Sequence, residues 1–205
     1  MNRRRRNGNI CVDTPVPFGG ALDWQEILRD YDESHAHNEE RQISWFRDQP
    51  SLRAAIEMAA HATDERGKRY DHQYRIRRAA IAAATAALLA AEPSVAAASS
   101  FDDLFNLVSV QLRGVDGIGE LYCYDTALRI GAYLGKFPTR VHLHRGTRAG
   151  AMAIKPGHRG DTLEVTELPP ELRSRQPLHV ENILCIYKDR LGASTNLPAR
   201  RRTAC

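Results

Sequence analysis

The chain has 205 residues, 42% of them hydrophobic, which is enough to bury a core in one domain or in one and a half. No run of 18 apolar residues occurs, which excludes a membrane-spanning helix, and the four cysteines lie too far apart for a structural zinc site or an iron–sulfur cluster. We therefore expect a cytoplasmic chain with reduced thiols, no cofactor and no membrane partner.

The net charge of +4 comes from the two ends, because seven arginines lie there and the rest of the chain sums to −3. Residues 1–20 carry Arg3 to Arg6 with prolines and glycines. Because no hydrophobic run follows these arginines, we expect no signal peptide there. Residues 193–205 form a second basic tail. We expect both ends to be disordered arms, which either attract polyanions or only keep the protein in solution, around a single folded domain over 21–192.

The first part of that domain, residues 22–65, is acidic and has helical patterning. It contains 11 acidic and 4 basic side chains, and a segment of this charge suits docking to a basic protein partner. A polar joint at 35–37 separates two helical pieces, and Pro50-Ser51 predicts a further helix over 52–62. One helical face of the first piece combines Trp24, Ile27, Leu28 and Tyr31.

Residues 66–78 reverse the charge, with six basic side chains against one acid. Tyr70 and Tyr74 are interleaved with arginines, a combination that suits phosphate contacts together with stacking on bases or sugars. A solvated linker with its tyrosines packed back on the core is the alternative. In the first interpretation, Arg75 and Arg77 add a line of contacts to nucleic acid.

Two helices are predicted next. The alanine-rich stretch 78–92 has high helix propensity and permits close packing, so we expect it to be the central, most buried helix. Ser100 and Asp103 resemble a capping box that begins a helix over 101–112.

A short link with three glycines, Gly114, Gly117 and Gly119, follows that helix. Glycines let the backbone turn through positive φ and let another backbone approach closely. A second apolar-periodic segment begins at once, and its inward side is expected to carry Leu121, Tyr124, Leu128, Ile130 and Leu134. The amides of Ile118, Gly119 and Glu120 would then lie at a helix start. Unpaired N–H groups and the positive end of the helix dipole favour an anion there.

Two helices joined in this way resemble the helix-hairpin-helix motif, which holds a nucleic-acid backbone through such amides. The resemblance rests on Val115, Gly117, Ile118 and Gly119, with the small Cys123 four residues later, within residues 112–131. It implies that Gly117, Ile118 and Gly119 present amides to one phosphate. An ordinary tight turn between core helices is the alternative.

The segment after the link favours an anionic partner, because no acid occurs between Asp125 and Asp161, whereas a solvated surface usually mixes both signs. Chance clustering is the alternative. The alternation at 140–144 indicates a short extended segment or a helix start, and a strand-like alternation is predicted at 162–165. Helices are predicted around 149–153 and over 178–191, the latter with an apolar stripe of Val180, Ile183, Leu184, Tyr187 and Leu191. The residues expected to hold a neighbouring phosphate are Arg145, Thr147 and Arg148, supported by Arg113 and Lys155.

DNA glycosylases built on this motif are mostly helical and of similar length, and they place a catalytic Asp after the hairpin. Many of them also carry a Lys two positions after its second glycine. Here that position is Leu121, and residues 126–160 contain no acid. The resemblance therefore implies a glycosylase-like architecture without the usual catalytic Asp or Lys.

The sequence predicts a mainly α, compact multi-helix domain that contains a helix-hairpin-helix element and at most one short strand pair. The predicted function is binding of DNA or structured nucleic acid through its phosphates, with little sequence readout. One alternative is a histidine- or metal-dependent enzyme on nucleic acid or a nucleotide, using Asp125, His142 and His144. The competing interpretation is that these histidines have a structural role and no catalytic one. Another alternative is a protein-interaction module in which the hairpin is only structural.

Overall fold

The computed structural model describes residues 23–193, and it is mainly helical, as predicted. One short antiparallel strand pair accompanies the helices, β1 (Val141–His142) against β2 (Thr162–Leu163). Nearly all of the two predicted arms lies outside the described residues. Between residues 23 and 193, no helix combines the length and apolar character needed to cross a membrane.

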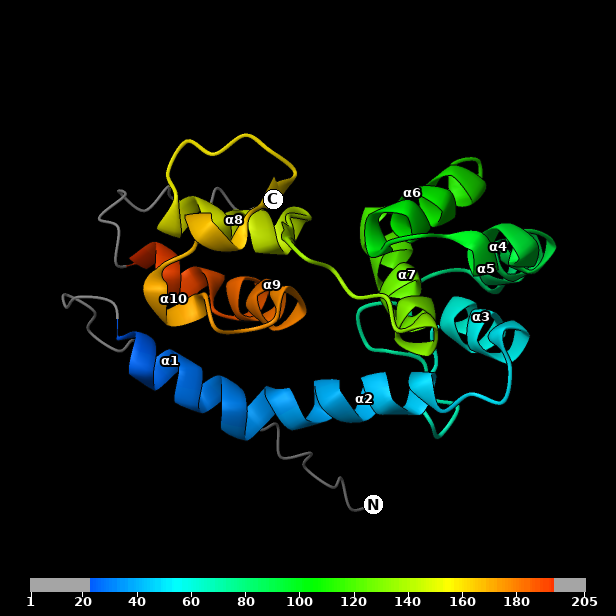
Figure 1. Cartoon of the computed structure of the whole chain (residues 1–205), viewed down its shortest axis with the longest axis horizontal. Coiled ribbons are helices and arrows are strands. Elements are labelled where there is room, and N and C mark those ends of the chain that lie inside the picture. The colour runs from blue at the N-terminus through cyan, green and yellow to red at the C-terminus, as the bar shows by residue number, and fades with distance from the viewer. Residues whose placement is uncertain (1–22, 194–205) are drawn as a thin grey trace, which may run out of the picture.

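The helices form two groups, which lie side by side in Figure 1, and each group surrounds a hydrophobic core of its own. We call the two groups the α3–α7 lobe and the α8–α10 lobe. The first contains α3 (Leu52–His61), α4 (Arg78–Ala90), α5 (Glu92–Ala97), α6 (Phe101–Leu112) and α7 (Glu120–Leu134). The second contains α8 (Arg145–Ile154), α9 (Pro177–Ile186), α10 (Lys188–Ala193), the strand pair and two 3-10 turns (Val165–Glu167 and Pro170–Leu172).

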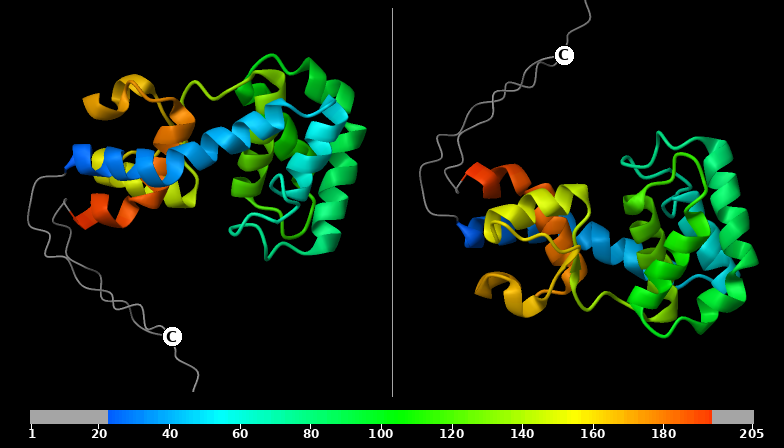
Figure 2. Two further views of the ribbon diagram at one scale, coloured as in Figure 1. Left: turned by 90° about the horizontal axis from the view of Figure 1, so that it is seen from below. Right: turned by 90° about the horizontal axis from the view of Figure 1, so that it is seen from above.

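A continuous N-terminal helix spans both lobes (Figures 1 and 2). It consists of α1 (Trp24–Tyr31), a π-helical stretch (Asp32–Ala36) and α2 (His37–Arg47). Ile27 and Tyr31 are buried in the core of the α8–α10 lobe, whereas Ile43 and Phe46 are buried in that of the α3–α7 lobe. The polar joint predicted at 35–37 therefore does not interrupt the helix; it lies on the span between the two cores.

Local capping signals set the helix starts where the sequence predicts them. Ser51 Oγ accepts a hydrogen bond from the amide of Ala54, and Ser100 Oγ accepts one from the amide of Asp103, both at 3.1 Å. Each bond satisfies an amide that the helix itself leaves without an acceptor. The predicted starts at residues 52 and 101 are confirmed.

Two expectations about the helices are wrong. The most buried helix is α7, because it packs against α2, α3 and α6, whereas α4 leaves one side exposed. The helix predicted over 178–191 is two helices, α9 and α10, separated at Tyr187. Its predicted apolar stripe is nevertheless buried, so the break redirects the chain without exposing the core.

Candidate functional site

A groove of about 630 Å³ lies where the start of α7 meets the start of α8, so each lobe contributes one wall. Leu121, expected to face the core, lines the groove and is 38% exposed, whereas the next two residues of the same turn, Tyr122 and Cys123, are buried. The groove is lined by Gly119, Glu120, Leu121, His144, Arg145, Gly146, Ala149, Cys185 and Lys188.

Both helix starts at this groove lack a side-chain cap, with Gly119 as the N-cap of α7 and His144 as that of α8. The first helical hydrogen bonds run from the Cys123 amide to Gly119 O and from the Arg148 amide to His144 O. The amides of residues 120–122 and 145–147 therefore have no acceptor within their own helices, and we call them the leftover amides. Two positive dipole ends meet at one cavity, an arrangement that favours anions.

The glycine link is built from two successive tight turns. The amide of Val115 donates to Leu112 O and that of Ile118 donates to Val115 O, at 3.0 and 3.2 Å. Gly117 has φ +84°, which favours glycine. The Ile118 amide, expected to face a phosphate, already has an acceptor inside the link. The donors left over at this end of α7 are those of its first turn.

The predicted basic residues differ in how much of their charge is already paired. Arg145 and Arg113 are exposed, and within residues 23–193 their side chains have neither a hydrogen bond nor an ion pair. Arg148 is held by Gly160 O and by Asp161 Oδ1, both at 2.8 Å, and Lys155 is paired with Glu167. Arg145 is therefore the predicted cation best placed to meet a ligand in the groove.

The side chain of Thr147, a residue expected to hold a phosphate, faces the interior. Thr147 is fully buried, and its Oγ1 donates a hydrogen bond of 2.6 Å to Glu181 Oε1. His144 Nε2 lies 3.0 Å from the same carboxylate oxygen. Burial by itself lowers the pKa of His144, but Glu181 outweighs it and the net shift is upward. Glu181, which the sequence analysis missed, therefore holds both Thr147 and His144 on the inner side of α8.

Asp125 on α7 is held by a set of polar neighbours. Its Oδ2 lies 2.7 Å from His72 Nε2, accepts a hydrogen bond of 2.7 Å from Gln73 Nε2 and lies 3.8 Å from Arg129 Nη2. Arg129 is only 1% exposed, and its guanidinium lies 4.1 Å from the Tyr70 ring centroid. The i, i+4 pairing of Asp125 with Arg129 seen in the sequence is thus part of a buried network.

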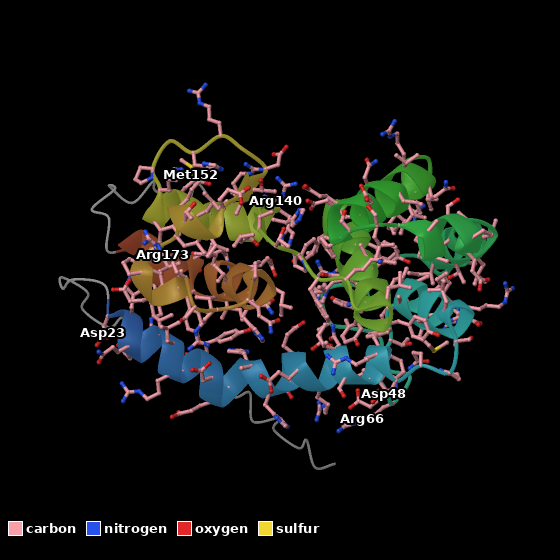
Figure 3. All side chains as sticks on the ribbon, viewed as in Figure 1. Asp23, Asp48, Arg66, Arg140, Met152 and Arg173 are labelled. Carbon is pink, nitrogen blue, oxygen red and sulfur yellow. The ribbon has the colours of Figure 1, made fainter. Side chains whose placement is uncertain are left out.

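We call the seam the set of charged side chains that interact electrostatically across the two lobes: Glu39, Asp125, Arg129, His144 and Glu181. Burial raises the pKa of the Glu39 carboxyl to about 7, and the negative charge of Asp125 acts in the same direction. Arg140 lies at the side of the α8–α10 lobe that faces the α3–α7 lobe (Figure 3). It makes a second bridge across the lobes, since it pairs with Asp102 of α6 and with Glu164 beyond β2.

The three predicted catalytic candidates have different partners. His142 lies 3.2 Å from Asp102 Oδ1 and packs among aromatic rings, whereas Asp125 pairs with His72 and His144 with Glu181. Burial lowers the pKa of His142 despite the nearby Asp102. In the described part of the chain, no group of three or more His, Cys, Asp or Glu side chains is arranged to hold a metal ion.

The basic segment 66–78 lies along α7. His72 and Gln73 anchor it to Asp125, and Arg77 lies 3.6 Å from Asp116 in the glycine link. Of its two tyrosines, Tyr70 packs against the core, whereas Tyr74 is 58% exposed. This segment therefore lies beside the link that was predicted to bind phosphate.

The acidic segment 22–65, predicted as a docking surface for a protein, uses several of its charges within the chain. Asp32 receives two hydrogen bonds from Arg175, at 2.5 and 2.7 Å, and Asp30 accepts one of 2.6 Å from the Tyr187 hydroxyl. These carboxylates attach α1 and the π-helical stretch to the α8–α10 lobe.

Comparison with known proteins gives no relative, since no family model, curated protein or solved structure matches the chain. We therefore infer the function from the chemistry of the groove and the seam. One signal for the seam was present in the sequence. Glu181 lies three residues from Leu178 and from Leu184 on an apolar helix, and a carboxylate in that position needs a buried partner.

Proposed function

We propose that the protein binds DNA or another structured nucleic acid through backbone phosphates in the groove between α7 and α8. The observation that supports this most is the meeting of two uncapped helix starts at one cavity, with Arg145 and Lys188 among its lining residues. A phosphate accepts hydrogen bonds from leftover amides and is attracted by both the helix dipoles and the cations.

The unit formed by α6, the glycine link and α7 would then work as a helix-hairpin-helix element. Arg113 lies exposed at the end of α6 and would add a positive charge beside the link, where Arg77 is already paired with Asp116. Contacts of this kind position a nucleic acid without reading its bases. Little sequence preference is therefore expected.

Gly119 offers a sharp test, because a side chain there meets open space and the backbone is extended, with φ −111° and ψ 177°. Asp and Asn are both favoured N-caps, so Gly119→Asp and Gly119→Asn should fold as well as the wild type. Only the Asp variant adds a negative charge at the proposed phosphate site. We expect about a tenfold loss of affinity for Gly119→Asp and a much smaller loss for Gly119→Asn.

Titration against duplex DNA, single-stranded DNA and RNA at several salt concentrations provides the measurement. Log affinity should fall linearly with log salt, by about 0.9 per neutralised phosphate. The double variant Arg145→Ala/Lys188→Ala should reduce that slope by up to about 1.8. Affinity that ignores salt between about 50 and 200 mM, or equal affinity of the two Gly119 variants, would contradict the proposal.

Acid–base chemistry on a nucleic acid at the seam is a second candidate. Glu39 is only partly buried, and its carboxyl pKa of about 7 suits proton transfer near neutral pH. Incubation with labelled oligonucleotides would then give a product with the wild type and none with Glu39→Gln, while both proteins bind equally. An absence of product from DNA and RNA alike would leave the seam with a structural role only.

A further inference from the structure

Tyr74 is the most exposed of the large hydrophobic side chains within residues 23–193, at 58%. The other tyrosine of the same segment, Tyr70, packs against the core and against Arg129. An exposed aromatic ring on a polar loop has no packing role to explain it. A ring in this state can contact a flat partner without any rearrangement of the core.

The chain on either side of Tyr74 is anchored to the proposed phosphate-binding unit. On one side, His72 and Gln73 contact Asp125, within α7. On the other, Arg77 pairs with Asp116 in the glycine link. The stretch of chain that carries Tyr74 therefore runs between Asp125 on α7 and Asp116 in the link.

Arg75 is the immediate partner of the ring. Its guanidinium carbon lies 5.3 Å from the ring centroid, and its Nε donates a hydrogen bond of 2.8 Å to the Tyr74 hydroxyl oxygen. The contact orients the ring and places a positive charge beside it. A ring with an adjacent cation matches one nucleotide, whose base stacks and whose phosphate is negative.

We propose that Tyr74, oriented by Arg75, stacks on an unpaired base next to the groove and so gives the protein a preference for single-stranded over duplex nucleic acid. This inference rests on the proposed function and adds a substrate class to it. In a duplex the bases stack on each other and their faces are covered, so the ring has nothing to contact. An unpaired base exposes its face, and such stacking is sequence-tolerant because every base has one.

Two probes that share a phosphate backbone separate stacking from charge. One is a short oligothymidylate and the other is an abasic oligonucleotide of the same length. The full-length wild type should bind oligothymidylate more tightly than the abasic strand and more tightly than a duplex. Tyr74→Ala should lower affinity for oligothymidylate by about tenfold or more and leave the other two affinities unchanged.

Conservative variants and a matched control complete the test. Tyr74→Trp and Tyr74→Phe keep an aromatic ring and should retain most of the preference. Val110→Ala truncates another exposed apolar side chain, 48% exposed, and should change nothing. Because Tyr74 is exposed, its variants should keep the unfolding temperature of the wild type.

The outcomes distinguish this inference from the proposed function. If the wild type binds duplex and single strand equally, with the expected salt dependence and sensitivity to Gly119→Asp, stacking is wrong and phosphate binding stands. If Tyr74→Ala lowers all three affinities equally, the ring acts on the backbone or the fold, and the preference is also wrong. If the wild type binds none of the probes but captures an acidic peptide, both proposals are overturned.

Discussion

The groove and the seam both lie where the two lobes meet, but charge is left unpaired in the groove and is paired within the chain in the seam. The groove has one exposed cation, Arg145, together with leftover amides and open space, whereas Lys188 there donates a hydrogen bond to Cys185 O. In the seam, the carboxylates of Asp125 and Glu181 each have close partners within the chain. An exposed cation costs little when it has no partner, whereas a buried carboxylate without one is strongly destabilising. Unpaired charge in the groove therefore points to a ligand, and paired charge in the seam points to the fold.

If this contrast is correct, the largest effect on stability comes from removing the buried cation of the seam. Arg129→Met leaves the Asp125 carboxylate without its guanidinium and empties the position over the Tyr70 ring. We expect the free energy of unfolding to fall by about 3–5 kcal/mol. Arg113→Met is the matched control on an exposed position and should stay within about 0.5 kcal/mol of the wild type in urea unfolding. Equal effects of the two substitutions would remove the distinction between groove and seam.

The second prediction concerns stability that comes from close packing inside the α8–α10 lobe and not from the charges of the seam. Gly150 lets α8 lie directly on α9, because a Cβ there would be 2.1 Å from Leu184 O. Gly150→Ala should therefore force the helices apart and destabilise the protein by about 1–3 kcal/mol. Gly119→Ala, where a Cβ meets open space, is the control and should be nearly neutral. Urea unfolding of both variants provides the comparison, and a neutral Gly150→Ala would mean that α8 and α9 adjust easily.

The third prediction uses the pH dependence of the seam. The pKa of Glu39 is raised to about 7 from the ordinary value of 4.5, mainly by burial. Between these two values the folded state keeps a proton that the unfolded state has released. The free energy of unfolding therefore falls as pH rises through this window. Glu39→Gln removes the titration, and its unfolding temperature should exceed that of the wild type at pH 8 by more than at pH 5.

Glu33→Gln, an exposed position on the same long helix, should follow the wild-type profile and serves as the control. His144 acts in the same direction as Glu39. Its raised pKa gives stability below the ordinary value of 6.5 that is lost as pH rises through the folded value. The difference between Glu39→Gln and the wild type isolates the carboxyl. A constant difference at all pH values would show that the pKa of Glu39 is the same in the folded and the unfolded protein.

The sequence predicted what depends on neighbouring residues and missed what depends on distant ones. Ser51 and Ser100 cap their own helices, so their signals are local, and both starts are confirmed. Which side of α8 faces inward depends on α9, more than 20 residues away, so the sequence did not show that the Thr147 side chain is buried. Leu121 was placed in the core by its helical spacing alone, yet it lines the groove, while the next two residues, Tyr122 and Cys123, are buried.

The smallest predicted effect concerns the acid in the groove. Glu120 is exposed in the first turn of α7 and lines the groove beside Gly119. Its carboxylate interacts favourably with the helix dipole but repels a phosphate at the same place. Glu120→Gln should therefore bind nucleic acid about two- to fivefold more tightly at low salt while losing about 0.3–1 kcal/mol of stability. Glu171→Gln, an exposed acid of the α8–α10 lobe, is the control for a change in net charge alone. Because net charge acts at long range and groove charge at short range, equal gains for the two variants would show that phosphate is held elsewhere than at the start of α7.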